Sequence, residues 1–287
     1  MCLIAFAIGA RTDLPLVIAS NRDEHWSRPT QPLQAWTLPS GKQAYSGRDL
    51  QAGGSWLGLA QDGRVAMLTN VRNGQPDAAP RSRGELVTQW LDAGSDWQDW
   101  LPRFDPLQYG GFNLVLGDLA HGRWAWVSNR SGAGGRQLRQ GWAGRELGPG
   151  VYGLSNAELD TPWPKTVALR QALRRHVESG AGENGADELL AALLDKEPAS
   201  AADLPSTGVE PGLERQLSSA FVHAPAMGYG TRSSLIVHAG SDGSASLMEW
   251  THAPDDPLAA RAGSRHWPLQ GSRLRQMAIM NRLGWRA

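Results

Sequence analysis

The stretch MCLIAFAIGARTDLPLVIASNRDEH, residues 1–25, decides the fold and contains Cys2, the one cysteine of the 287-residue chain. Residues 2–9 and 14–21 are mostly apolar and strand-compatible, and a polar ARTD segment separates them. This pattern predicts a β-hairpin. The second strand is expected to end at Ser20, so the hairpin brings the polar residues that follow it close to Cys2.

Two interpretations of Cys2 are open. A free cysteine most often behaves as a small buried apolar residue. Removal of Met1 would instead make Cys2 the N-terminal residue, with a thiol and an α-amine together. The unperturbed pKa of an α-amine, about 7.7–8.0, suits a base that takes the thiol proton. Asparagine side chains would then stabilise the oxyanion, and the chemistry would need neither histidine nor metal.

The polar cluster Asn21, Arg22, Asp23 and Glu24 also has two interpretations. Charged residues after a strand usually form a solvated turn. The predicted hairpin, however, places this cluster beside the first residues of the chain. A carboxylate there would hold the α-ammonium group or orient the thiol of Cys2.

The remaining chain alternates strand and helix patterns, which favours an α+β fold with mostly antiparallel pairing. No repeat or clear linker divides it, so we expect one domain over residues 1–287. The predicted elements are hairpins at 55–70, 112–129 and 231–250, a short strand at 151–156, helices at 82–94, 161–180 and 186–196, and a basic amphipathic segment at 272–283.

Composition excludes several classes of protein. Lys and Arg number 28, as do Asp and Glu, so nothing indicates a nucleic-acid partner. No apolar run approaches the ~18 residues of a transmembrane span. One cysteine excludes an intramolecular disulfide framework and a multi-thiol zinc site, so we expect a cytoplasmic protein. The seven histidines form no HExxH motif, and no metal site is predicted.

Several motifs resemble one known family. They are MCLIAF, ASNRDEHWSRPT, GRDLQAGGSWLGL, LTNVRN, SRGELV, YGGFNLVLGD, YGLSNAELDTPWPK, LPSTGV and YGTRSSLIV. In this order, from residue 1 to about residue 238, they resemble the NRDE family, also called the transport and Golgi organisation 2 family. The resemblance implies an Ntn-hydrolase-like four-layer αββα sandwich, in which two mainly antiparallel sheets lie between helices.

The resemblance also implies roles for individual residues. Cys2 matches the nucleophile of the choloylglycine hydrolase and penicillin V acylase group, and Asp23 matches the aspartate that contacts it. Ser20 stands where those hydrolases carry arginine, which displaces the positive charge to Arg22. The further catalytic matches are the oxyanion asparagines Asn70 and Asn156 and the late arginine Arg232, and the residues expected to contact substrate are Asn21, Arg22 and Glu24.

Two functions follow from the resemblance. One is hydrolysis of an amide or thioester bond through an N-terminal Cys2, with no cofactor required. The other is binding without turnover, as a haem chaperone or an acyl-CoA or lipid-binding protein that uses the same cleft. Either function implies a small-molecule ligand, with haem as one candidate.

Overall fold

The structure is a computed structural model of the 287-residue chain. The amphipathic segment predicted at 272–283 lies outside the part that is described. The described residues are 2–74, 79–132, 135–138, 141–180, 182–254 and 261–269.

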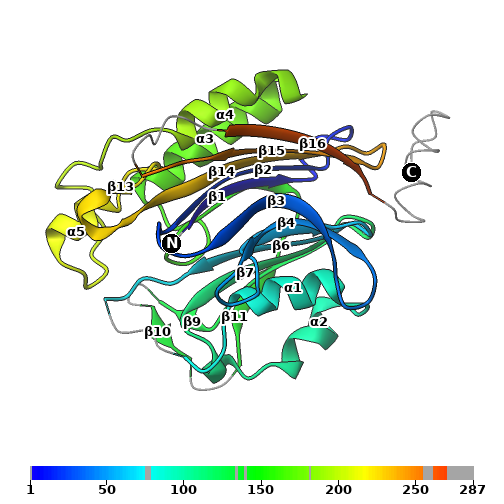
Figure 1. The fold of residues 1–287 in the computed structure, drawn as a ribbon, viewed down its shortest axis with the longest axis horizontal. Helices are drawn as coiled ribbons and strands as arrows, with labels where there is room; N and C mark the ends of the chain where they lie inside the picture. The colour runs from blue at the N-terminus through cyan, green and yellow to red at the C-terminus, as the bar shows by residue number, and fades with distance from the viewer. Residues whose placement is uncertain are drawn as a thin grey trace.

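Two seven-stranded sheets stack face to face (Figure 1). Every strand pair within them is antiparallel. The first sheet has the order β12 (Gly150–Leu154), β1 (Cys2–Ile8), β2 (Leu16–His25), β14 (Tyr229–Ala239), β15 (Ser244–Thr251) and β16 (Arg261–Pro268), with β13 (His223–Ala224) beside β14. The second has the order β11 (Ala143–Glu146), β8 (Arg123–Ser128), β7 (Phe112–Asp118), β6 (Arg64–Asn70), β5 (Leu57–Ala60), β4 (Gln43–Asp49) and β3 (Thr30–Thr37). A separate two-stranded ribbon joins β9 (Arg130–Ser131) to β10 (Arg136–Gln137).

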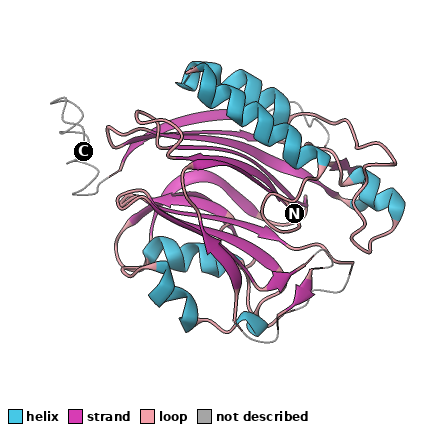
Figure 2. Cartoon of the chain, turned by 180° about the vertical axis from the view of Figure 1, so that it is seen from behind, coloured by secondary structure: helices cyan, strands magenta, loops and turns pink. Residues whose placement is uncertain are grey.

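Helices cover the outer face of each sheet, as Figure 2 shows, and this confirms the predicted αββα sandwich. The first sheet is covered by α3 (Pro164–Ser179) and α4 (Ala186–Leu193), and the second by α1 (Gly84–Asp92) and α2 (Trp97–Trp100). The fifth helix, α5 (Pro211–Gln216), lies beyond the end of the first sheet. Short 3-10 turns occupy Leu101–Arg103, Pro106–Gln108, Gly182–Gly185 and Pro225–Met227.

Strand β1 shows why its sequence reads as a continuous apolar run. Cys2, Ile4, Phe6 and Ile8 face the layer between the sheets, while the alternate residues pack under α3 and α4. Both faces are buried, so the usual polar alternation is absent. Burying each large apolar side chain of this strand stabilises the fold by about 1.5–3 kcal/mol. Cys2 therefore begins the strand on its intersheet face.

The predicted end of the second strand was wrong. β2 continues through the polar cluster to His25, because it has a neighbour on both sides in the sheet. β1 pairs with it up to the opposition of Cys2 and Arg22, and β14 pairs with it to its last residue. The cluster after Ser20 is therefore strand, where side chains alternate between faces.

The predicted hairpins correspond to β5–β6, β7–β8 and β14–β15, and the predicted helices to α1, α3 and α4. The elements that were not predicted are helices α2 and α5 and strands β3, β4, β9, β10, β11, β13 and β16. Within the described part of the chain, no helix is both long enough and apolar enough to cross a membrane.

Candidate active site

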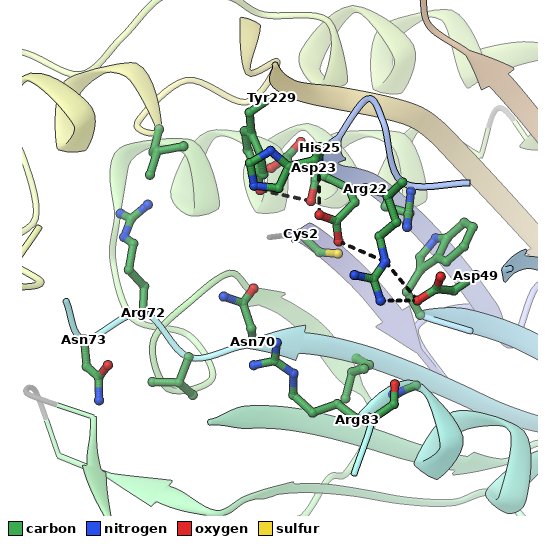
Figure 3. Close-up of a pocket in the computed structure, with 18 of the residues that line it drawn as sticks. Cys2, Arg22, Asp23, His25, Asp49, Asn70, Arg72, Asn73, Arg83 and Tyr229 are labelled. Carbon is green, nitrogen blue, oxygen red and sulfur yellow. Dashed lines mark hydrogen bonds and ion pairs between the residues drawn. The ribbon is translucent and has the colours of Figure 1, made fainter. Parts of the chain in front are cut away.

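A cleft of about 600 Å³ opens where the ends of β2 and β6 face one another. Figure 3 shows side chains from both sheets around it, with the sulfur of Cys2 on one wall and Asn70 on the other. Its lining residues include Cys2, Arg22, Asp23, Glu24, Trp56, Leu68, Asn70, Val71, Arg72, Arg83, Leu213 and Leu217.

Cys2 and Asp23 come together because the register of β1 and β2 places Cys2 opposite Arg22. The Thr231 hydroxyl donates to Oδ1 of Asp23 at 2.7 Å, and the Tyr229 hydroxyl donates to the Asp23 carbonyl oxygen at 3.0 Å. Cys2 is 7% exposed, and burial raises the pKa of its thiol. The resting group is therefore a neutral thiol that needs a base before it can attack a carbonyl.

Lys165, at the start of α3, was not predicted as a site residue. It is 6% exposed, and its Nζ donates to the carbonyl oxygen of Leu217 at 2.7 Å. Burial lowers the pKa of Lys165 to about 8, while the charge of Asp23 acts in the opposite direction. Burial likewise raises the pKa of Asp23, and the Lys165 ammonium opposes that change. The two charges therefore interact, with Asp23 on the lining of the cleft and Lys165 buried behind it.

A sequence signal for Lys165 existed. The apolar face of the helix predicted at 161–180 includes Leu169, Ala172 and His176. Extending this face one turn toward the N-terminus reaches Lys165, because residues four apart share a helix face. Helical periodicity alone therefore placed a lysine on a buried face.

The two predicted oxyanion asparagines, Asn70 and Asn156, are in direct contact but occupy different positions relative to the cleft. Asn70 ends β6 and lines the cleft, whereas Asn156 is fully buried behind it. The Asn156 Nδ2 donates to the backbone oxygen and to Oδ1 of Asn70, both at 3.0 Å. With its Oδ1 occupied, the donor that Asn70 offers to the cleft is its own Nδ2. Asn156 is placed to orient Asn70.

Arg22 and Glu24 line the cleft on either side of Asp23. The Arg22 guanidinium carbon lies 4.2 Å from the centroid of the Trp56 ring. Glu24 Oε2 lies 3.8 Å from Nε of Arg28, whose Nη2 lies 2.6 Å from Oδ2 of Asp49. Glu24 is therefore part of a charged cluster at the rim.

Asn21 and Arg232 are not brought to the cleft. Asn21 points toward the helices, where its Nδ2 donates to the carbonyl oxygens of Leu193 at 2.7 Å and Ala220 at 2.9 Å. Arg232 lies at the register shift of β14, and its Nη1 donates to the carbonyl oxygens of His25 and Arg28. These bonds give both side chains a structural role in this conformation.

A buried ion pair fastens one wall of the cleft. Arg72 follows β6 and pairs with Glu214 of α5, and both side chains are about 5% exposed or less. Thr207 bridges them: its hydroxyl donates to Glu214 at 2.6 Å and accepts from Nε of Arg72 at 3.1 Å. The pair joins the segment after β6 to α5, from which Leu213 lines the cleft.

The arrangement offers a thiol, a buried carboxylate and an amide donor at one opening. That set suits attack on a carbonyl carbon and stabilisation of the resulting oxyanion. Within the described ranges, His, Cys, Asp and Glu side chains form no group of three or more that could hold a metal ion.

Comparisons with known proteins bear on the family and the fold of the chain. Residues 1–254 match the Transport and Golgi organisation 2 family. A Transport and Golgi organization protein 2 homolog from Bos taurus is 32% identical over 94% of this chain and 100% of its own length. The Homo sapiens homolog is 34% identical over 87% of this chain and 92% of its own. Among solved structures, the C2A mutant of a conjugated bile acid hydrolase from Clostridium perfringens has the same fold, with a TM-score of 0.52, 8% identity, and coverage of 95% of this chain and 98% of its own.

Proposed function

The chain belongs to the Transport and Golgi organisation 2 family, and from the cleft at Cys2 we propose that it hydrolyses an amide or thioester bond with Cys2 as its N-terminal nucleophile. The observation that carries the proposal is the convergence of Cys2, Asp23 and Asn70 on one opening. The fold shared with a bile acid hydrolase is compatible with it. The proposal requires that Met1 be removed, because the base is the α-amine of Cys2.

The chemistry proceeds in two halves. The α-amine takes the thiol proton as Sγ of Cys2 attacks the carbonyl carbon, and the oxyanion accepts a hydrogen bond from Nδ2 of Asn70. The ammonium then protonates the leaving amine or thiol, which leaves an acyl thioester on Cys2. Water attacks this thioester and gives its proton to the α-amine. Expulsion of Sγ, which regains that proton, releases the carboxylic acid.

Asp23, on the lining of the cleft, and Lys165, buried behind it, support this cycle. A carboxylate beside the α-amine stabilises the ammonium form that appears in each half-reaction. Lys165 in turn keeps a positive charge near Asp23 and so favours the carboxylate. Both act as positioning residues in the proposal, because the substrate reacts at Sγ of Cys2.

The test is turnover of matched acyl donors. Leu68, Val71, Leu213 and Leu217 give the cleft an apolar part, so octanoic acid is a suitable acyl group. We would assay its p-nitroanilide, its N-acetylcysteamine thioester and its glycine amide. Release of octanoate that saturates with substrate is expected from at least one. Saturable binding of haem or an acyl-CoA, with no hydrolysis of any of the three donors, would contradict the proposal.

The contact between the asparagines makes a separate prediction. Asn156→Leu removes the amide that orients Asn70 while filling a similar volume, so kcat should fall about 10–100-fold with little change in KM. Asn70→Leu removes the donor itself and should cost about 10²–10³-fold in kcat. Steady-state kinetics on the most reactive of the three donors measures both. An unchanged kcat in Asn156→Leu would remove its positioning role.

A further inference from the structure

Arg22 is an unusual charge for its surroundings. Its side chain points to the same face as Cys2, it is 5% exposed, and its Nη1 is buried with no hydrogen-bond partner. Two carboxylates at the rim of the cleft, Glu24 and Asp49, form ion pairs with Arg28. In the part of the chain that the structure describes, no carboxylate forms an ion pair with Arg22.

Trp56 fixes the orientation of this guanidinium. The ring supports one face of the group at 4.2 Å, so the N–H bonds at its edge remain directed within its plane. Strand β4 leaves space for the ring at Gly47, because a Cβ at that position would approach Trp56 Cη2 to 2.3 Å. The stack is therefore built into the wall of the cleft rather than formed by a loose surface side chain.

A buried guanidinium N–H with no hydrogen-bonded anion is costly, because its lost hydration is not replaced. Binding of an oxyanion offsets this cost, because its oxygens accept a bidentate pair of hydrogen bonds from the guanidinium N–H groups. Arg22 and Cys2 are directly opposed across β1 and β2, and such residues have Cα atoms about 4.5–5.5 Å apart. An anion on Arg22 would therefore lie only a few bonds from a carbonyl at Sγ.

We propose that Arg22 and Trp56 form an anion subsite, and that the natural ligand carries a carboxylate or phosphate-type group within a few bonds of its reacting carbonyl. The position of the anionic group relative to a reacting carbonyl rests on the proposed hydrolase function. The subsite itself is a binding site and is testable without turnover. A carboxylate and a phosphate would both accept hydrogen bonds from the guanidinium, and the affinities of matched probes distinguish the two.

The experiment is calorimetric titration of Cys2→Ala, which retains the subsite and has no nucleophile. Three probes share an octanoyl amide: octanoylglycine, its neutral carboxamide octanoylglycinamide, and octanoyl-aminomethylphosphonate. We expect at least one anionic probe to bind about tenfold or more tightly than the carboxamide. Preference for the glycine compound identifies a carboxylate site, and preference for the phosphonate identifies a phosphate-type site.

Two variants test whether the preference for anionic probes comes from Arg22. Arg22→Gln in the Cys2→Ala background should remove the tenfold discrimination and leave carboxamide affinity within about threefold. Arg83→Gln removes a positive charge from another part of the cleft lining and should preserve the discrimination, which controls for net charge. Thermal unfolding of each variant checks folding, and the comparison of probes on Cys2→Ala alone stands even if Arg22→Gln is unstable.

Two outcomes would overturn the proposal. One is equal affinity of the charged and neutral probes, or no binding of any probe at millimolar concentration. The other is discrimination that survives in Arg22→Gln. Hydrolysis of the neutral p-nitroanilide alongside either outcome would leave the hydrolase intact and remove only the anion subsite.

Discussion

Cys2→Ala is expected to reduce acyl turnover at least about 10⁴-fold, the largest effect of any single substitution. The thiol forms the covalent bond in the proposed cycle, and Cys2 is the one cysteine of the chain. Loss of a covalent nucleophile in acyl-transfer enzymes costs several orders of magnitude and leaves the residual rate due to binding and oxyanion stabilisation. Octanoate release from the most reactive donor measures the loss.

Two companion measurements make that result interpretable. Cys2→Ser retains a weaker nucleophile at the same position and should retain more activity than Cys2→Ala. Octanoylglycine affinity in Cys2→Ala tests whether the cleft survives the substitution. Turnover by Cys2→Ala within about tenfold of the unmodified protein would show that the reaction does not pass through Cys2.

Glu214→Gln is expected to lower the free energy of unfolding by about 3–5 kcal/mol. The substitution removes one charge of the buried Arg72–Glu214 pair and leaves the Arg72 guanidinium uncompensated. Thr207 bonds to both members, so its hydroxyl also loses a charged partner. Urea unfolding followed by circular dichroism measures the change.

A matched surface pair provides the control. Arg175 and Glu188 are 60% and 51% exposed and lie 2.8 Å apart, so Glu188→Gln should change stability by no more than about 1 kcal/mol. The double variant Arg72→Met/Glu214→Leu should regain much of the stability, because apolar side chains replace both charges. Equal stability of Glu214→Gln and Glu188→Gln would show that the buried pair does not hold the cleft wall.

Much of the β1–β2 core was predictable from sequence. Two apolar runs with a polar turn gave the hairpin, and the hairpin placed the polar cluster beside Cys2. The four-layer arrangement came from the family resemblance, since local patterns do not specify how two sheets stack. Asn70 and Asn156 were assigned by their motifs, and the contact between them agrees with a shared site.

The errors have a physical origin in strand periodicity and in long-range pairing. Four consecutive polar residues resemble a turn, yet two neighbouring strands keep them in the sheet. Alternation then directs Asn21 to the helices and Arg22 to the cleft. A sequence read as a turn cannot separate those two directions. The ion pair of Glu214 could not be predicted either, because its partner Arg72 is far away in the sequence.

The intact mass of the protein after brief exposure to the octanoyl thioester tests directly whether Cys2 is an N-terminal nucleophile. We expect a chain that lacks Met1 and carries one octanoyl group, and the same exposure should leave Cys2→Ala unmodified. A protein that retains Met1 while it hydrolyses the donor would contradict this mechanism, because the α-amine of Cys2 would then be unable to act as the base.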